Sequence, residues 1–100
     1  MSILDSEPLG PVEARQLVRR ILKSPDGRVL FTRHAKQERM KERGITEDEV
    51  FGCLARAFCG SNITHEKGSW RYPMETPGLV VVVAFDSETL ALVITTWRRK

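Results

Sequence analysis

The chain has 100 residues, of which 41% are hydrophobic and 29% are charged, and its formal net charge is +3. This length and composition are typical of one globular domain and exclude a disordered chain. No apolar run approaches the roughly 20 residues of a membrane-spanning helix, and the first ten residues lack the basic and apolar segments of a signal peptide. The positive charge permits an anionic partner without establishing one.

The first third of the sequence predicts one helix and one short strand. We expect residues 1–10 to form a flexible lead-in. Apolar residues then recur at helical spacing, and Pro11 suits a first helical position, which predicts a helix over 11–24. Turn-forming residues at 24–27 end this helix. A short β-favouring run follows at 29–32.

Two further helices are predicted in the middle of the chain. Thr32 is a suitable N-cap for a helix over 33–43, and Gly44 can end it. Thr46 and Glu49 then have the spacing of a capping box, which opens a third helix. The apolar residues of this third helix predict one buried face, made of Val50, Phe51, Leu54, Ala57 and Phe58.

The last part of the chain has the two-residue period of β-strands. Residues 62–66 and 69–74 flank a tight turn and predict a hairpin, in which Pro73 indicates an edge or a short strand. The run at 79–85 is apolar on both faces and predicts a central strand, and 90–97 predicts the last strand. The fold class is therefore α+β, with N-terminal helices packed on a C-terminal antiparallel sheet.

Charge is distributed unevenly along the chain. Residues 33–43 hold five basic and two acidic side chains, whereas 44–66 hold one basic and four acidic ones. A second basic cluster lies at 98–100. If the second helix and the end of the last strand meet in space, these clusters form a concave site for phosphate. Arg43, before Gly44, also simply suits a helix C-terminus and stays outside the predicted site.

The cysteine and histidine spacing does not predict a metal site. Cys53 and Cys59 are six residues apart on a predicted helix and are poorly placed to pair with each other. Two unpaired cysteines favour a reduced, cytoplasmic protein. The spacing of these cysteines and His65 matches no standard zinc pattern, and the chain has no glycine-rich phosphate loop. We therefore expect neither a metal nor a cofactor.

The residue types that remain suit metal-free cleavage of RNA. Such a reaction needs a base for the 2′-hydroxyl proton, an acid for the leaving 5′-oxygen, and a cation for the charge on the phosphate oxygens. Histidine can serve as base or acid near neutral pH, and arginine offers a planar pair of donors to phosphate. The sequence places His34 and several arginines in its basic regions.

One segment resembles a known family. The residues that carry the match are Phe31, Thr32, His34, Ala35, Arg39, Met40, Arg43, Gly44, Ile45, Thr46 and Val50. They resemble a family of bacterial domains of unknown function that is similar to BrnT-type and RelE-type toxins and is grouped with the barnase, colicin and RelE ribonuclease superfamily. The resemblance continues through 71–72, 78–85 and 95–98. It implies a RelE-like domain over 28–100, with 1–27 as an N-terminal extension that adds one helix.

The resemblance also implies RNA as substrate and, often, a small antitoxin protein that covers the site. Carried over to this sequence, it makes His34 the acid–base candidate. Arg71 and Arg98 would grip the scissile phosphate, and Thr95 would assist them. Further contacts with RNA are expected from Arg39, Lys36, Thr96 and Arg99. No membrane contact is expected, and the oligomeric state is not predicted.

Several of these residues have an ordinary structural interpretation as well. His34 could instead tie its helix to the preceding strand, and Arg39 could belong to a solvated stripe. In a regular strand, Arg98 shares a face with Thr96 rather than with Thr95. A β-bulge would bring Thr95 and Arg98 together; otherwise Thr96 is the hydroxyl in the site.

The aromatic residues of the hairpin favour the core. Trp70 and Tyr72 share a strand face with Met74, and this pattern favours packing over base stacking. Arg71 points the opposite way and needs water or a partner. His65, on the same hairpin, is expected to be an ordinary exposed histidine.

The functional hypothesis is a sequence-relaxed endoribonuclease that leaves a 2′,3′-cyclic phosphate. His34→Ala and Arg98→Ala are each expected to abolish cleavage and to leave the fold intact. The alternative is a non-catalytic RelE-like module that binds and regulates a protein or a nucleic acid, because the candidates include one credible histidine and no carboxylate.

Overall fold

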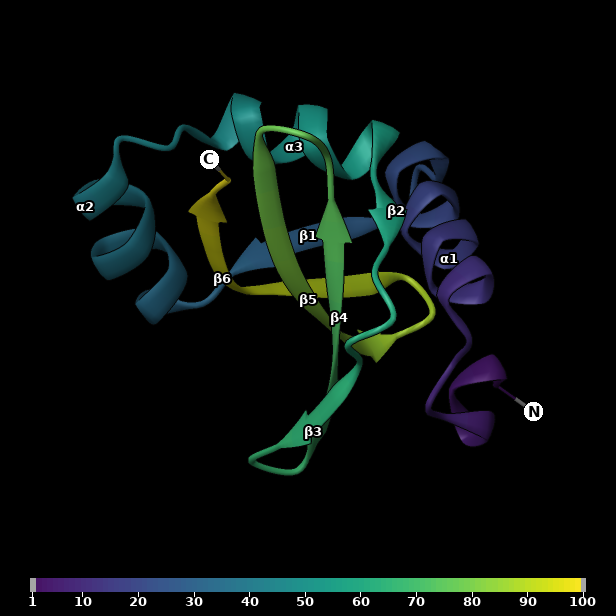
Figure 1. Ribbon diagram of the computed structural model, residues 1–100. Coiled ribbons are helices and arrows are strands. Elements are labelled where there is room, and N and C mark those ends of the chain that lie inside the picture. The colour runs from purple at the N-terminus through teal and green to yellow at the C-terminus, as the bar shows by residue number, and fades with distance from the viewer. Residues whose placement is uncertain (1, 100) are drawn as a thin grey trace.

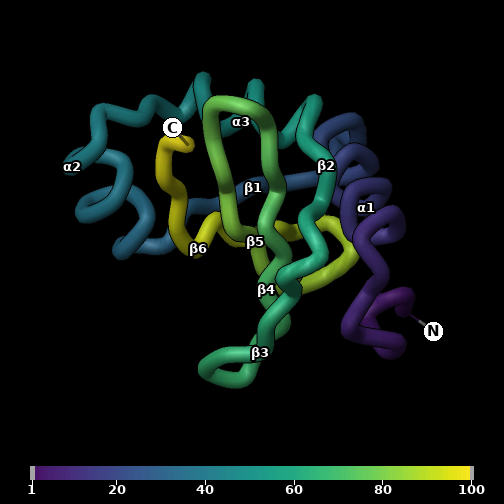
Figure 2. The backbone as a smooth tube through the Cα atoms, in the orientation of Figure 1, coloured from purple at the N-terminus to yellow at the C-terminus, as the bar shows by residue number. Residues whose placement is uncertain are grey.

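The computed structural model describes residues 2–99 (Figures 1 and 2). Met1, in the predicted lead-in, and Lys100, in the basic C-terminal cluster, lie outside these residues. No helix within the described range is long and apolar enough to cross a membrane. The elements in chain order are η1 (Ile3–Ser6), α1 (Pro11–Lys23), β1 (Arg28–Phe31), η2 (His34–Met40), α2 (Lys41–Arg43), α3 (Glu47–Arg56), β2 (Phe58–Cys59), β3 (Thr64–Glu66), β4 (Ser69–Glu75), β5 (Leu79–Ser87) and β6 (Leu90–Arg98).

The fold is α+β, as predicted, but its sheet is mixed. The strand order is β1-β6-β5-β4-β2, with β3 paired to β4, and β5 is the central strand that its apolar run predicts. The strands from β2 to β6 pair antiparallel, whereas β1 pairs with β6 in parallel. The prediction of a purely antiparallel sheet is therefore wrong for β1. Helices separate β1 from the other strands, so β1 joins the sheet through a crossover and not through a hairpin.

Helices α1 and α3 cover one face of the sheet (Figure 1). Along β4, β5 and β6, alternate side chains point into this layer, as the strand period requires. The core includes Leu17, Val18 and Ile21 of α1, Val50, Cys53 and Leu54 of α3, and Tyr72, Met74, Val81, Val83 and Val93 of the sheet. The N-terminal helix and the remaining domain therefore share one hydrophobic core.

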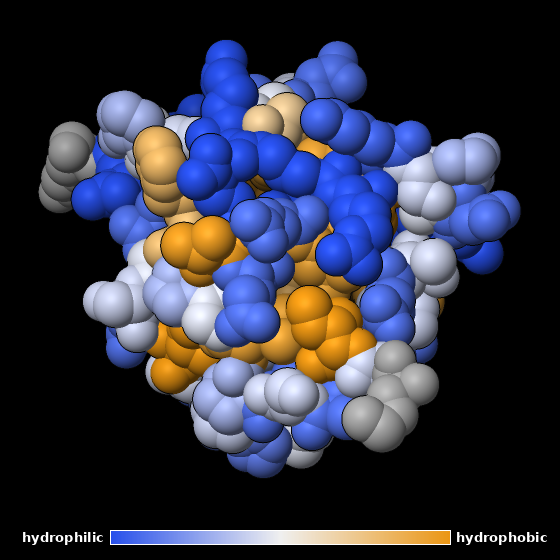
Figure 3. Space-filling model, turned by 90° about the vertical axis from the view of Figure 1, so that its right-hand side faces the viewer, coloured by the Kyte–Doolittle hydropathy of each residue, from blue (hydrophilic) through white to orange (hydrophobic). Residues whose placement is uncertain are grey.

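The outer side of α1 is basic. Figure 3 views the molecule from the side of α1 and shows hydrophilic residues around separate hydrophobic areas. Arg15, Arg19, Arg20 and Lys23 line a shallow hollow here. Arg19 also donates hydrogen bonds to the carbonyls of Ala55 and Ala57 at 3.0 Å, which ties α1 to the C-terminal end of α3.

The capping box of α3 is confirmed, but its predicted buried face is partly wrong. The hydroxyl of Thr46 accepts from the backbone N–H of Glu49, and the Glu49 carboxylate accepts from the N–H of Thr46, both at 3.1 Å. Phe51 is 36% exposed and Phe58 is 66% exposed. The helix ends before Phe58, which lies in β2 and so leaves the helical period. Its ring lies 4.6 Å below the guanidinium of Arg15.

The N-terminal residues are packed rather than flexible, which corrects the prediction of a flexible lead-in. Leu9 is buried in the core cluster. The hydroxyl of buried Tyr72 accepts from the N–H of Leu9 at 3.1 Å and donates to the carboxylate of Glu7 at 2.6 Å. A buried phenol requires hydrogen-bond partners, and this segment supplies both of them.

The β3–β4 hairpin forms as predicted, with positive φ at both Lys67 and Gly68, as in a type I′ turn. The interpretation of Pro73 needs correction, because β4 is neither short nor an edge strand. Along the side away from β5, the pairing with β3 ends at Arg71 and the pairing with β2 begins at Met74. Pro73 lies in the gap between these two pairings, where no strand partner requires its N–H.

The second predicted helix forms, but residues 34–40 are wound as a π-helix. Thr32 caps it, because its hydroxyl accepts from the N–H of Ala35 at 3.2 Å, and Gly44 ends it with a φ of 64°. In a π-helix, side chains four and five positions apart lie close together. The helical segment η2–α2 lies beside the second half of β6, where Arg43 donates to the carbonyl of Thr96 at 3.2 Å.

Candidate functional site

A β-bulge in β6 decides which threonine reaches the surface. Val83 pairs with Val93, but Val82 pairs with Thr95, so Ile94 is an extra residue. The side chain of Thr96 therefore points into the core, where it is 0% exposed and donates to the Val80 carbonyl at 2.7 Å. Thr96 cannot contact RNA, which corrects that prediction. The bulge lies before both threonines, so it does not bring Thr95 and Arg98 onto one face.

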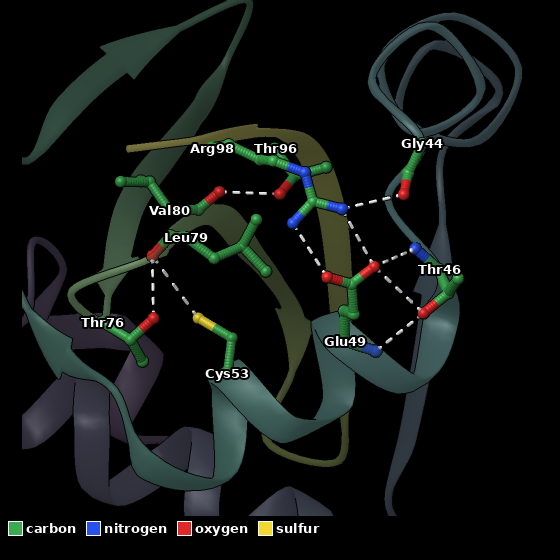
Figure 4. A network of polar contacts seen from close by, with 9 residues as sticks. All are labelled: Gly44, Thr46, Glu49, Cys53, Thr76, Leu79, Val80, Thr96 and Arg98. Atoms are coloured by element: carbon green, nitrogen blue, oxygen red, sulfur yellow. Dashed lines mark hydrogen bonds and ion pairs between the residues drawn. The ribbon is translucent and has the colours of Figure 1, made fainter. Parts of the chain in front are cut away.

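Arg98 forms a two-pronged ion pair with Glu49 at the start of α3 (Figure 4). One guanidinium nitrogen lies 2.9 Å and the other 3.1 Å from the two carboxylate oxygens, and the second nitrogen also donates to the Gly44 carbonyl at 2.8 Å. The hydrogen bonds from Arg98 are the main cause that lowers the pKa of Glu49 from 4.5 to about 2. Arg98 therefore links β6 to the N-terminus of α3.

Arg98 also lines a basic hollow. We call it the arginine hollow; its volume is about 600 Å³, and it is lined by Arg39, Arg43, Thr95, Trp97 and Arg98. This lining holds three guanidinium groups. Their carboxylate neighbours lie just outside it: Glu42 is 3.6 Å from Arg39 and 3.8 Å from Arg43, and Glu49 pairs with Arg98. Arg43, which stands outside the predicted site, belongs to the hollow because the helical segment lies beside β6.

A second hollow adjoins the first through Arg39. This His34 hollow has a volume of about 640 Å³ and is lined by His34, Gln37, Glu38, Arg39, Lys41 and Glu42. Nδ1 of His34 contacts the Glu38 carboxylate, and Arg39 Nε donates to His34 Nε2 at 3.3 Å. Because Nε2 accepts a hydrogen bond, the proton of the neutral imidazole is assigned to Nδ1, which donates a hydrogen bond to Glu38. The predicted site lacks Glu38, although its four-residue spacing from His34 is a signal that the sequence contains.

A third hollow continues across the sheet. This Arg71 hollow has a volume of about 240 Å³ and is lined by Asn62, Thr64, Glu66, Arg71, Pro73, Val82, Thr95 and Trp97. It shares Thr95 and Trp97 with the arginine hollow. Five of the predicted residues, His34, Arg39, Arg71, Thr95 and Arg98, therefore line one connected set of hollows.

Two predicted RNA contacts lie elsewhere. The ammonium of Lys36 is paired with the carboxylate of Glu47 at 3.1 Å, and the guanidinium of Arg99 is paired with that of Glu75 at 3.0 Å. Neither residue lines any of the three hollows. Their contact with RNA therefore stays a prediction that the three hollows do not support.

The aromatic residues divide between core and surface. Tyr72 and Met74 are buried and Trp70 packs against the core, as predicted, while His65 is exposed with its ring 4.8 Å from that of Trp70. Trp97 lies on the outer face and is 38% exposed. The predicted site lacks Trp97, although its two-residue spacing from Thr95 is the signal that places both on one face.

The cysteines and the remaining large hollow do not suggest catalysis. Burial raises the pKa of both Cys53 and Cys59, the latter to about 11, so neither thiol is ionised at neutral pH. Within residues 2–99, no group of three His, Cys, Asp or Glu side chains is placed to hold a metal. A hollow of about 500 Å³ beside α3 mixes Arg56 and Arg98 with three carboxylates, which does not favour an anion.

Comparisons of the chain with protein-family models, with curated proteins and with solved structures found no match. The resemblance to BrnT-type and RelE-type toxins therefore stays a prediction from the sequence. A functional assignment has to rest on the geometry of the three hollows and on the chemistry of the side chains that line them.

Proposed function

We propose that this chain binds single-stranded RNA along the three hollows and cleaves it as a metal-independent endoribonuclease. The observation that carries the proposal is the arginine hollow, which brings three guanidinium groups together and adjoins His34 through Arg39. The finer features expected from the sequence, a RelE-like arrangement of the fold, an antitoxin partner and a cytoplasmic location, belong to the same proposal.

The hollows suit a polyanion because arginine binds phosphate with two parallel hydrogen bonds. Arg39 and Arg43 project from the helical segment, and Arg98 comes from β6. Arg71 lies beyond Trp97, at the opposite end of the surface. A strand of RNA that follows the hollows meets a cation at each end and in the middle.

His34 is the proposed base. A carboxylate on one ring nitrogen fixes the tautomer and leaves the other nitrogen to exchange protons. Glu38 holds Nδ1 in this way, and Nε2 accepts from Arg39 at 3.3 Å, so the proposed reaction requires Arg39 to turn from the imidazole to the phosphate. In the reaction, Nε2 takes the proton of the 2′-hydroxyl and the 2′-oxygen bonds to phosphorus. The bond from phosphorus to the 5′-oxygen breaks and water protonates the departing oxygen. The hydroxide that this leaves takes the proton back from Nε2, so the products are a 2′,3′-cyclic phosphate and a 5′-hydroxyl.

The second candidate function is a non-catalytic module that binds RNA or a protein. Arg98 favours it, because its guanidinium is already held by Glu49 and Gly44 and is not free to follow a reacting phosphate. The two candidates share the binding surface. They differ in whether His34 transfers a proton.

The test compares the purified protein with two histidine variants on a single-stranded RNA. The wild type is expected to yield fragments that end in a cyclic phosphate, with chelator present. His34→Ala is expected to lower the cleavage rate by about 10²–10⁴-fold, the usual contribution of a general base. His65→Ala is the matched control, because His65 is an exposed histidine on the β3–β4 hairpin, and its rate should equal that of the wild type.

Two results would contradict the ribonuclease. The first is RNA that stays intact although it binds, which favours the binding module. The second is cleavage that His34→Ala does not slow, which assigns the activity to another group or to a contaminant.

A further inference from the structure

We infer that Trp97 is a stacking platform for one unpaired nucleobase, with Arg71 holding the phosphate beside it. The ligand class is therefore single-stranded nucleic acid, and Trp97 is a binding residue that sets this preference. The inference deepens the proposed function and rests on it for the identity of the anion.

The bulge at Ile94 places Trp97 on the outer face of β6, together with Thr95. Cross-strand neighbours share a face, so the row beside Thr95 continues through Val82 to Pro73. Pro73 and Val82 of this row line one hollow together with Trp97, and the direct cross-strand partner of Trp97 is the apolar residue Val80. The other tryptophan, Trp70, packs against the core and against His65, and so it cannot serve the same purpose.

An arginine side chain lies in the hollow on each side of Trp97, although the Arg71 hollow also contains the carboxylate of Glu66. On one side lies the arginine hollow, with Arg39, Arg43 and Arg98. On the other lies the Arg71 hollow. Proteins that bind single strands combine a basic groove with aromatic rings on which the bases stack. The indole lies between the basic arginine hollow and the buried guanidinium of Arg71, which suits a phosphate–base–phosphate ligand.

Arg71 has an unmet hydrogen-bonding need. Its side chain is only 18% exposed, and its one carboxylate neighbour, Glu66, lies 3.6 Å from Nη1. Its Nε is buried and has no hydrogen-bond partner among the described residues. A phosphate in the Arg71 hollow would accept from this guanidinium. Trp97 and Thr95 line the same hollow, so the base attached to that phosphate lies within reach of the indole.

The exposed ring favours a single strand over a duplex. In a duplex the bases stack on one another, so an aromatic side chain can reach a base face only where the strand is unpaired. An acidic peptide also meets the charge requirement, but it has no flat π-system for the indole. The chemistry on this face therefore favours nucleic acid, and the acidic polymer serves as the contrasting probe.

The experiment uses the fluorescence of Trp97 in a Trp70→Phe background. The probes are an eight-nucleotide single strand with 2′-O-methyl riboses, which cannot be cleaved, an abasic strand of the same length, a duplex and polyglutamate. Saturable quenching by the single strand is expected, with binding at least roughly tenfold weaker for the abasic strand, because stacking contributes substantially per base. Equal quenching by polyglutamate or by the duplex would overturn the inference.

Variants then separate stacking from charge, with affinity measured by the fluorescence anisotropy of a labelled strand. Trp97→Ala should weaken binding of the base-bearing strand roughly tenfold or more and leave its salt dependence unchanged, whereas Trp97→Tyr should retain most of the affinity. Arg71→Ala should reduce the slope of log affinity against log salt by about 0.7, the value for one phosphate contact on a single strand. Circular dichroism checks that each variant is folded. Unchanged affinity in Trp97→Ala, or lost affinity in both Trp97 variants with the fold intact, would refute the platform.

The outcomes also distinguish this inference from the ribonuclease. Because the probe cannot be cleaved, quenching and base dependence without cleavage of ordinary RNA leave the platform standing and remove the role of His34. Cleavage of ordinary RNA by Trp97→Ala with an unchanged KM removes the platform and leaves the ribonuclease standing.

Discussion

Thr96→Val tests the placement of the bulge, on which the whole outer face depends. The threonine side chain is fully buried, and its hydroxyl donates to the Val80 carbonyl at 2.7 Å. Valine has nearly the same shape and lacks the hydroxyl. The substitution therefore removes one buried hydrogen bond and leaves the packing almost intact.

The magnitude follows from that bond. A buried polar group that loses its partner costs about 1–3 kcal/mol, and the added methyl group offsets a part of this. We expect the free energy of unfolding to fall by about 1–2 kcal/mol for Thr96→Val. For a domain of this length, such a loss lowers Tm by about 5–10 °C. Thr95→Val is the matched control on the outer face, where substitutions usually change stability by less than about 0.5 kcal/mol.

Urea unfolding at neutral pH measures both variants against the wild type. With the bulge at Ile94, Thr96→Val is expected to be clearly less stable than Thr95→Val. Equal losses, or a larger loss in Thr95→Val, would mean that the bulge is not at Ile94. The face that carries Trp97 would then be the buried one, and the proposed platform would fail with it.

Two further predictions concern contacts that join distant parts of the chain. The pKa of Glu49 is about 2 in the folded protein and about 4.5 when the carboxyl is unpaired, so its ion pair stabilises the fold above about pH 4.5 and loses this effect as the pH falls toward 2. The difference in unfolding free energy between wild type and Glu49→Gln, measured by urea unfolding at low salt, should therefore shrink from pH 6 to pH 3. A difference that stays constant would refute the stabilising role of this ion pair. Tyr72→Phe removes the hydroxyl that bonds both Glu7 and Leu9, and it should lower the free energy of unfolding by about 1–3 kcal/mol. Amide hydrogen exchange at Leu9 should become faster, and an unchanged rate would mean that other contacts hold the N-terminal segment.

The local elements were predictable because their signals lie within a few residues. The capping box of Thr46 and Glu49 closes within one turn, and it identified the start of α3. The turn at Lys67 and Gly68 likewise contains its own conformational requirement, since both residues need positive φ. Local structures of this kind form independently of the rest of the fold, as long as the segment stays at the surface.

The features that shape the candidate site were not predictable, because they depend on long-range pairing. β1 pairs in parallel with β6 because one edge of β6 is free, and no local sequence pattern indicates that this edge is free. The extra residue at Ile94 is visible only against the register of β5, yet it exchanges the positions of Thr95 and Thr96. The π-helical winding of η2 is a third such feature, and it brings Arg39 next to His34.

The parallel pairing of β1 with β6 also sets the order in which the molecule can be completed. Among the described residues, β1 pairs only with residues 90–93 of β6, so it cannot join the sheet before these residues have been synthesised. The helical segment after β1 takes its place beside the same late strand. A ribosome-bound chain, which folds from its N-terminus, therefore carries His34 long before it has the strand that supplies Trp97. If the proposed activity is correct, the chain cannot act on RNA during most of its own synthesis.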